Sequence, residues 1–162
     1  MSTSIIRRVG FSLVELVIVV TIISIVAAIA VPRISRGVTG ATEASLTGSL
    51  STMRRAIEMY SAEHEGLLPL NKEDFVAQMT MYTDLSGAVN ATKTADFRFG
   101  PYLKAIPPLP LGEYAGDARV IDGSSPGAKK DGGWWYDEDT GDIRANLKND
   151  QVDETGTPYN QY

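Results

Sequence analysis

The sequence predicts an α+β protein in which a long N-terminal helix, membrane-spanning in its first half, packs on a small antiparallel β-sheet head. Three observations predict this fold. An almost uninterrupted apolar run fills 16–31, an apolar stripe at helical spacing follows at 46–60, and apolar and polar residues alternate near the C-terminus. We therefore expect a transmembrane helix at 11–31, a continuation of the helical stalk at 32–66, and an α+β head at 67–162.

The apolar run is long enough to cross a membrane as a helix. Only Thr21 and Ser24 interrupt it, and with residues 11–15 the segment reaches about twenty residues, enough for a hydrocarbon core of about 30 Å. Arg7 and Arg8 precede the run, and basic residues remain on the cytoplasmic side of a membrane. We expect a single-pass protein with its N-terminus in the cytoplasm.

A cleaved secretory signal is the nearest alternative, because it also has a basic start and an apolar stretch. The small residues from Ala27 to Ala30 offer a cleavage site of the usual type. The apolar core of such a signal, however, has only about 7–15 residues, which is shorter than the run found here. The length of the run therefore favours a helix that is retained.

Glu15 is the one carboxylate in the apolar segment. An ionisable group inside a membrane helix is costly unless it is paired, so such a residue is a functional candidate. Alternatively, Glu15 lies near the membrane surface, where its side chain reaches water and meets the positive N-terminus of the helix.

The string GFSLVELVIVVTIISIVAAIAVP, from Gly10 to Pro32, resembles the N-termini of type IV pilins and type II secretion pseudopilins. The resemblance implies that a prepilin peptidase removes the leader 1–10 by cutting between Gly10 and Phe11, and then methylates the new amine of Phe11. It also implies an assembly role for Glu15 and a helix kink at Pro32. Phe11 and Glu15 are four residues apart and share a helix face, so Glu15 of one subunit can pair with the terminal amine of the next.

The resemblance also implies a function and a set of partners. The protein would be a structural subunit of pilin-like lollipop shape, held in the inner membrane with its head in the periplasm, that assembles into a type II secretion pseudopilus for protein export. Its partners would be prepilin peptidase, further copies of itself, other pseudopilins, and the secretion ATPase with its inner-membrane platform.

Within this family the sequence looks most like the major, G-type pseudopilin of the general secretion pathway. The segment from Tyr102 to Gly112 and the hairpin after Trp134 carry this likeness, and many type IV pilins close a C-terminal loop with a disulfide that this cysteine-free chain cannot form. Two alternatives remain open: a major or minor pilin of a type IV pilus, and a signal-anchored periplasmic binding protein that does not polymerise.

The composition excludes several other classes of protein. The 162 residues contain no cysteine and a single histidine, His64, which argues against disulfides, thiol catalysis and a multi-histidine metal centre. The net charge of −5, with no basic cluster, argues against a nucleic-acid partner. No nucleophile–base pair is visible, so we expect no enzyme.

The stalk is expected to be weakened near its middle and amphipathic toward its end. Pro32 lacks an N–H for the helix, and Gly37, Gly40 and Gly48 each cost about 1 kcal/mol relative to Ala. The stripe that should face the head consists of Leu46, Leu50, Met53, Ile57 and Tyr60. The solvated face should hold Arg54, Arg55, Glu58, Glu63 and Glu65, with His64 in an exposed last turn and Gly66 as the stop.

The head is expected to contain a variable region at 67–116, a sheet at 117–147 and a tail at 148–162. In the variable region we expect a short helix capped by Asn71 and Asp74, a loop at 85–94 with a glycosylation sequon at Asn90, and an extended linker at 102–112. The apolar side of the short helix would consist of Phe75, Val76, Met79 and Tyr82. The expected strands are 118–121, 134–137 and 142–147, with a turn at Thr140 and Gly141.

Two acidic clusters in the last third need a separate interpretation. The first contains Asp137, Asp139 and Asp142, and the second contains Asp150, Asp153 and Glu154. The first does not follow the EF-hand pattern, and acidic residues are ordinary in turns, so no metal site is assigned. Because major pseudopilins carry calcium in a C-terminal loop, the resemblance leaves a structural calcium ion as an alternative to a solvated turn.

Overall fold

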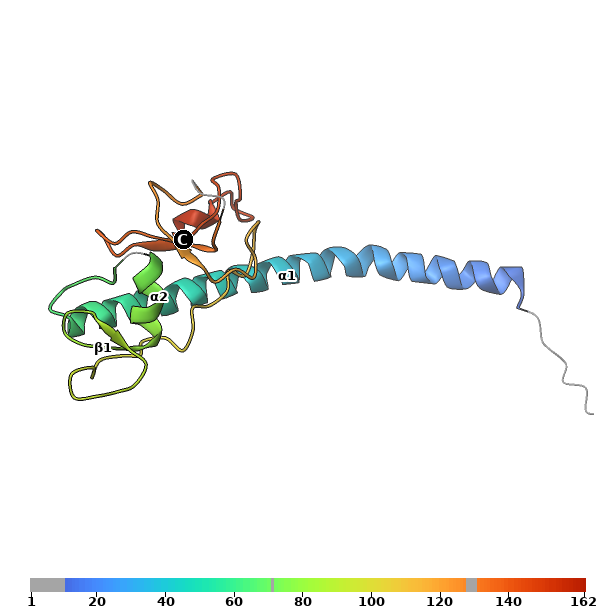
Figure 1. Ribbon diagram of the computed structural model, residues 1–162. Coiled ribbons are helices and arrows are strands. Elements are labelled where there is room, and N and C mark those ends of the chain that lie inside the picture. Colours follow the sequence, from blue (N-terminus) through green and yellow to red (C-terminus); the bar gives the residue numbers. More distant parts are fainter. Residues whose placement is uncertain (1–10, 71, 128–130) are drawn as a thin grey trace, which may run out of the picture. The chain divides into compact units, whose positions relative to one another are not determined.

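The computed structural model describes residues 11–70, 72–127 and 131–162, with the backbone alone at 31–36, 72 and 73 (Figure 1). The chain divides into two units, Met1–Gly40 and Ala41–Tyr162. Helix α1, Leu13–Glu63, contributes to both units, and every other element belongs to the second. The predicted class is confirmed, because the end of α1 packs on a small sheet in an α+β head.

The end of α1 turns one apolar face toward the rest of the head. The five predicted stripe residues are all buried, and they form one cluster with side chains of the sheet and of the linker before it. Spacings of three and four residues keep such a stripe on one side of a helix. The predicted stripe is therefore confirmed. In Figure 1 the region of β1 lies below this part of α1 and the C-terminal strands lie above it.

Helix α1 ends three residues before Gly66, the glycine predicted to stop it. The last helical residue is Glu63, and the Gly66 N–H donates a hydrogen bond of 2.8 Å to the Ser61 carbonyl. Gly66 has a φ of 89°, a left-handed conformation that glycine adopts without steric cost and that closes many helices.

His64 is fully buried, so the expectation of an exposed last turn is wrong. Its ring stacks on Tyr60 with 3.8 Å between the ring centroids. One ring nitrogen, Nδ1, lies 2.8 Å from the Tyr60 carbonyl, and Nε2 lies 3.0 Å from Oγ1 of Thr83. The strand that carries Thr83 covers the end of α1, which is a contact between distant parts of the chain that helical periodicity does not encode.

The variable region holds a helix and a small hairpin. Helix α2, Lys72–Thr80, buries Phe75 and Met79 as predicted, whereas Val76 is exposed. The cap expected at Asn71 lies outside the described residues. Strands β1, Tyr82–Thr83, and β2, Val89–Asn90, pair antiparallel, so Tyr82 belongs to a strand instead of the helix.

The segment expected as a loop at 85–94 therefore contains a strand. Buried Gln78 of α2 supports this hairpin, because its Nε2 donates to the Gly87 carbonyl at 2.9 Å and its Oε1 accepts from the Leu70 N–H at 2.8 Å. The side-chain amide thus connects the chain before α2 with the hairpin after it.

The C-terminal sheet has three strands in the order β3, β4, β5. These are β3, Val120–Ile121, β4, Trp134–Tyr136, and β5, Ile143–Ala145. The β4–β5 pair is the predicted antiparallel hairpin, with Tyr136 opposite Ile143. The β3–β4 pair is parallel, so the expectation of an entirely antiparallel sheet is wrong. The connection 122–133 is long enough to return the chain to the same end of the sheet, as a parallel pair requires.

The proline-rich linker runs extended over the sheet, as predicted. Leu103, Ile106 and Leu109 point into the core, and the indole N–H of buried Trp134 donates to the Pro107 carbonyl at 2.7 Å. Gly133 allows this close packing, because a Cβ there would lie 2.2 Å from the Asp117 carbonyl oxygen and 3.1 Å from Cβ of Leu109 in the linker. Any larger residue at 133 would push these segments apart.

The tail folds back onto α1 through polar contacts. Arg54, expected on the solvated face, is half-buried and donates to the main-chain oxygens of Ile143 and Tyr162. The Tyr159 hydroxyl donates to the Glu43 carboxylate at 2.9 Å. The tail, which ends in the short helix η1, Tyr159–Gln161, is therefore part of the folded head.

Candidate functional site: the N-terminal segment of α1

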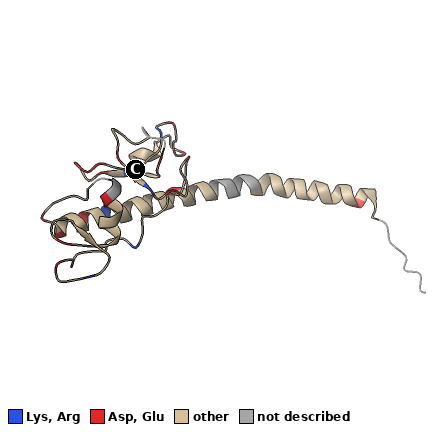
Figure 2. Ribbon diagram, viewed as in Figure 1, with Lys and Arg blue, Asp and Glu red and all other residues tan. Residues whose placement is uncertain are grey.

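The side chains of the first part of α1 are not covered by protein. Residues 11–29 are all exposed, and Ala30 is half-buried. The window Leu13–Ala30 has a mean hydropathy of 2.9, so this helix is long and apolar enough to cross a membrane. In Figure 2 the segment is tan apart from the acidic site in its first turn. An exposed apolar surface of this length needs lipid or partner helices to cover it.

Two of the three polar side chains between Leu13 and Ala30 are satisfied within the helix. The hydroxyl of Thr21 donates to the Val17 carbonyl, and that of Ser24 donates to the Val20 carbonyl, both at 2.7 Å. Such bonds to the preceding turn hide a hydroxyl from an apolar environment. Neither residue therefore requires a partner from outside the helix.

Glu15 is the third polar side chain, and it has no hydrogen bond or ion pair with any residue that the structure describes. It lies in the first turn of α1, where the Leu16 N–H donates to the Ser12 carbonyl at 3.1 Å. The free N–H groups of a first turn favour a carboxylate. A charge in this position can also pair with a cation supplied by another molecule.

The predicted processing residues, Gly10 and Phe11, and the predicted kink at Pro32 lie at or beyond the limits of the residues that the structure describes. Phe11 precedes α1 and is 73 % exposed. Gly10, with the rest of the leader 1–10, lies outside the described residues. Helix α1 is assigned through Pro32, whose side chain is also outside the description, and the kink expected there stays a prediction.

Two carboxylates of the first acidic cluster, Asp137 and Asp142, are engaged in local contacts. The Asp137 carboxylate accepts from the Asp139 N–H at 3.0 Å and the Thr140 hydroxyl at 2.8 Å, and Asp142 pairs with Arg144 at 2.5 Å. These contacts are those of a hydrogen-bonded hairpin turn. Among the described residues, no three His, Cys, Asp or Glu side chains come close enough together to hold a metal ion.

Asp153 of the second cluster has a full set of donors. Its carboxylate accepts from the Tyr162 hydroxyl at 2.6 Å and from the N–H groups of Thr155 and Thr157 at 2.7 and 2.8 Å. The hydrogen bond from Tyr162, followed by that from Thr155, holds the pKa of Asp153 well below its usual range. The same bond raises the pKa of Tyr162 to about 12.

An apolar N-terminal helix followed by a small α+β head is the arrangement of proteins that are anchored in a membrane at their N-terminus. Residues 10–31 match the family described as the prokaryotic N-terminal methylation motif. This motif is the prepilin signal of pilin-like proteins, whose family is structural and not enzymatic. The match supports membrane anchoring, processing by a prepilin peptidase, and a place among the pilins and pseudopilins. No curated protein and no solved structure matches the chain.

Proposed function

We propose that this protein is a pilin-like subunit that assembles into a type II secretion pseudopilus for protein export. The observation that carries the proposal is the match of residues 10–31 to the methylation motif, on a helix with one acidic residue in its first turn. In this proposal a prepilin peptidase cuts between Gly10 and Phe11 and methylates the amine of Phe11. The helix that remains anchors the subunit in the inner membrane, with the head in the periplasm.

Assembly would use Glu15 as the partner of a neighbouring N-terminus. Burying the positive amine of Phe11 between apolar helices is unfavourable unless an acceptor of opposite charge faces it. Glu15 is suited to this task because it has no partner among the described residues, whereas Thr21 and Ser24 are satisfied internally. A subunit in the wrong register would leave two charges unpaired, so the pair would also select the correct register.

The mass of the mature N-terminus tests this proposal. We expect the protein extracted from membranes to begin at Phe11 and to carry one methyl group on its terminal amine. A host lacking the prepilin peptidase should retain all of residues 1–10. Retention of Met1 in the normal host, or cleavage after Ala30, would instead indicate a signal-anchored protein that does not polymerise.

A type IV pilus is the second candidate function, because the matched motif alone does not separate pilins from pseudopilins. The extended linker at 102–112 and the absence of cysteine favour the secretion pseudopilus. Deletion of the gene should therefore abolish the export of secreted proteins and leave surface pili in place. Loss of surface pili with normal export would favour the pilus. An adjoining gene for a secretion ATPase, platform protein or secretin would give independent support.

For the head we propose a fold that needs no calcium ion. Asp137, Asp142 and Asp153 already accept local hydrogen bonds or an ion pair, so binding a cation would require these contacts to break. The melting temperature should be the same in millimolar calcium and in excess chelator. A rise with calcium that the chelator reverses would show a structural calcium site.

A further inference from the structure

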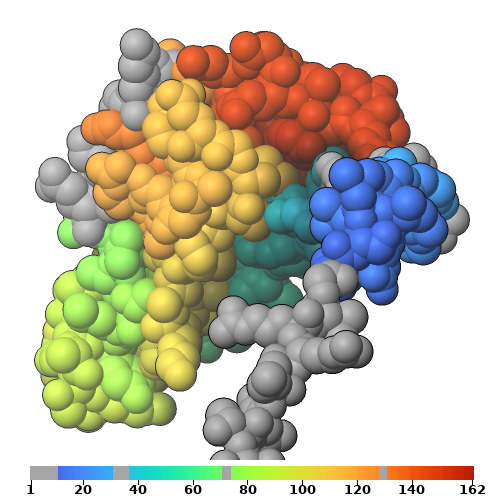
Figure 3. Space-filling view, turned by 90° about the vertical axis from the view of Figure 1, so that its right-hand side faces the viewer, coloured from blue at the N-terminus to red at the C-terminus, as the bar shows by residue number. Residues whose placement is uncertain are grey.

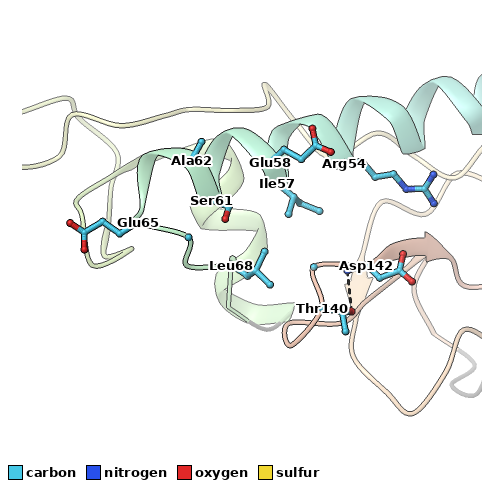
Figure 4. Close-up of a pocket in the computed structure, with 11 residues that line it drawn as sticks. Arg54, Ile57, Glu58, Ser61, Ala62, Glu65, Leu68, Thr140 and Asp142 are labelled. Atoms are coloured by element: carbon cyan, nitrogen blue, oxygen red, sulfur yellow. Dashed lines mark hydrogen bonds between the residues drawn. The ribbon is translucent and has the colours of Figure 1, made fainter.

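A groove of about 800 Å³ runs beside the last turns of α1 (Figure 4). The helix forms one wall, and the turn of the β4–β5 hairpin with Thr140 and Asp142 forms the other, with Leu68 between them. Ile57 and Leu68 make its floor apolar. The volume lies within the range of about 300–1,000 Å³ that accommodates small ligands, so the groove can receive a few side chains of a partner.

The rim of this groove carries a net negative charge. Its four charged residues are Arg54, Glu58, Glu65 and Asp142. Arg54 is held by two main-chain oxygens, and Asp142 is paired with Arg144. Glu58 and Glu65 are exposed and have no hydrogen bond or ion pair with the residues that the structure describes. A partner that fits the groove should therefore be apolar in the middle and basic at its edges.

A loop of the same chain carries two basic side chains, Lys93 and Arg98, and Ala95, Asp96 and Phe97 lie between them. Residues 91–98 follow β2, and all are exposed except Phe97, which is half-buried. Lys93 lies 5.9 Å from the centre of the Tyr82 ring and Arg98 lies 4.9 Å from that of Phe99. Neither cation has an ion pair within the described ranges, so both charges are available to a carboxylate of another molecule.

The loop is also held in shape before any partner arrives. The Thr94 N–H donates to the Phe97 carbonyl, and the Phe97 N–H donates to the Thr94 hydroxyl, both at 3.2 Å. A preformed loop loses little conformational entropy on binding. The single acidic residue of the loop, Asp96, leaves it with a net positive charge opposite the acidic rim of the groove.

The loop and one wall of the groove, the β4–β5 turn, lie on different sides of the head. In Figure 3 the yellow-green surface near residue 90 is at the lower left, and the red surface of the C-terminal residues is at the top. Because the loop lies away from the β4–β5 wall of its own groove, each head can offer a loop to one neighbour and a groove to another. A contact between two different patches is heterologous and continues from copy to copy.

We propose that the groove between α1 and the β4–β5 turn binds the loop 91–98 of a second copy of this chain, with Glu58 and Glu65 facing Lys93 and Arg98. This inference rests on the proposed assembly, which brings identical heads side by side. The contact would be weak in isolation, because exposed ion pairs contribute little. In a filament it would fix how neighbouring heads meet.

Introduced cysteines test this contact without crosslinking at other thiols of the chain, because the natural sequence contains no cysteine. Ala62 lines the groove and Ala95 lies in the loop, and both are exposed. We would express the full-length Ala62→Cys/Ala95→Cys chain in its host and treat intact cells with a short bis-maleimide. Because every copy offers both thiols, the expected product is a ladder of dimers, trimers and larger species, with residues 62 and 95 linked in mass spectra.

The matched control replaces Thr52, which is exposed on the same helix, does not line the groove, and lies ten residues, about 15 Å, before Ala62. The Thr52→Cys/Ala95→Cys chain should give no ladder. Equal ladders from both chains, or linkage of residue 62 to a different protein, would overturn the inference. A chain processed between Gly10 and Phe11 that gives no ladder would overturn it while leaving the proposed function intact. An unprocessed chain would contradict the proposed function and the inference together.

Charge reversal gives a second test of the same contact. Glu58→Lys with Glu65→Lys in the two-cysteine chain should reduce the ladder roughly fivefold, as expected for the loss of exposed ion pairs. Adding Lys93→Glu and Arg98→Glu should restore it. Glu154→Lys, which changes an exposed charge away from the groove, should leave the ladder unchanged. Failure of the second pair of changes to restore the ladder would exclude the proposed pairing of charges.

Discussion

At the level of single residues, Glu15 differs from the other polar side chains between Leu13 and Ala30 because its charge cannot be satisfied within one turn of helix. The hydroxyls of Thr21 and Ser24 reach the carbonyls four residues before them. A carboxylate cannot do the same, because it has no hydrogen to donate to a carbonyl. Its partner must be a donor, and within an apolar bundle a charged amine is the best one available.

Glu15→Val should therefore insert and be processed normally but assemble poorly. In the proposed assembly the change leaves the amine of the neighbouring subunit buried without a counter-charge, which costs several kcal/mol, so incorporation into filaments should fall at least tenfold. Thr21→Val is the matched control, because it removes a polar group that is satisfied internally. A shearing or crosslinking assay measures incorporation, and normal incorporation of Glu15→Val would remove the assembly role.

His64 is the second residue whose environment decides its role. It is buried against three aromatic rings, with 3.8 Å to the centroid of Tyr60, 5.1 Å to that of Phe99 and 6.3 Å to that of Tyr102. Both ring nitrogens are within hydrogen-bond distance of oxygen atoms. The side chain therefore joins the end of α1 to β1 through packing and polar contacts together.

Replacing His64 with Phe should keep the packing and lose the bond to Thr83. The buried hydroxyl left behind should lower the free energy of unfolding by about 1–3 kcal/mol. The double variant His64→Phe/Thr83→Val should cost less than the sum of its single changes, because no polar group remains unpaired. Denaturant unfolding of the full chain in detergent measures this, with exposed Ala62→Ser as the control. Additive losses would argue against coupling between the two side chains.

At the level of elements, the tail is stabilised by a carboxylate at its centre. Asp153 accepts hydrogen bonds from Tyr162, Thr155 and Thr157, and the bond from Tyr162 is the main reason for its depressed pKa. A carboxyl group whose pKa is lower in the folded state stabilises the protein fully above its unfolded pKa of about 4. That contribution is lost as the pH falls below this value toward the pKa of the folded state.

The melting temperature should consequently fall more steeply below pH 4 in the natural chain than in Asp153→Asn. Tyr162→Phe should also flatten the curve, because it removes the donor with the largest effect on the pKa of Asp153. Asp139→Asn, at an exposed turn position whose side chain accepts no hydrogen bond within the described residues, is the matched control. Parallel curves for the natural chain and Asp153→Asn would show that the carboxylate does not contribute.

The elements that could be predicted from the sequence are those set by local spacing. The stripe from Leu46 to Tyr60, the stop at Gly66 and the β4–β5 hairpin each depend on residues close together in the chain. The parallel pairing of β3 and β4 and the burial of His64 depend on segments separated by long connections. Periodicity carries no information about such pairings, which is why these two expectations were wrong.

The candidate sites also differ in whether they depend on neighbouring residues or on distant segments of the chain. The methylation motif at 10–31 could be predicted because it is continuous in sequence, and the roles of Gly10, Phe11 and Glu15 stay predictions. The groove beside Glu58 could not be predicted, because it forms only where the β4–β5 turn approaches α1. The position of Arg54 could not be predicted for the same reason. Its charge suggested a solvated position, but it donates to main-chain oxygens of Ile143 and Tyr162, which lie far away in the sequence.

At the level of the whole molecule, the two units differ in what stabilises them. Every buried apolar residue in the described ranges lies between Leu46 and Leu147, inside the unit Ala41–Tyr162. The N-terminal part of α1 buries no side chain in the protein, so its helix must be stabilised by lipid or by other subunits. The free energy of folding of the head therefore should not depend on the membrane segment.

A fragment that begins at Ala41 should accordingly fold without detergent and melt close to the full chain. It retains the stripe, both small sheets, and the Glu43 carboxylate that accepts from Tyr159 at 2.9 Å. We expect the midpoints to agree within about 4 °C, the shift that 1 kcal/mol produces in a domain of this size. Met53→Ala, which removes a fully buried side chain, should lower the midpoint equally in both forms, because it leaves the same cavity. Circular dichroism measures the two transitions, and a fragment that is unfolded or much less stable would show that the first unit contributes to the stability of the head.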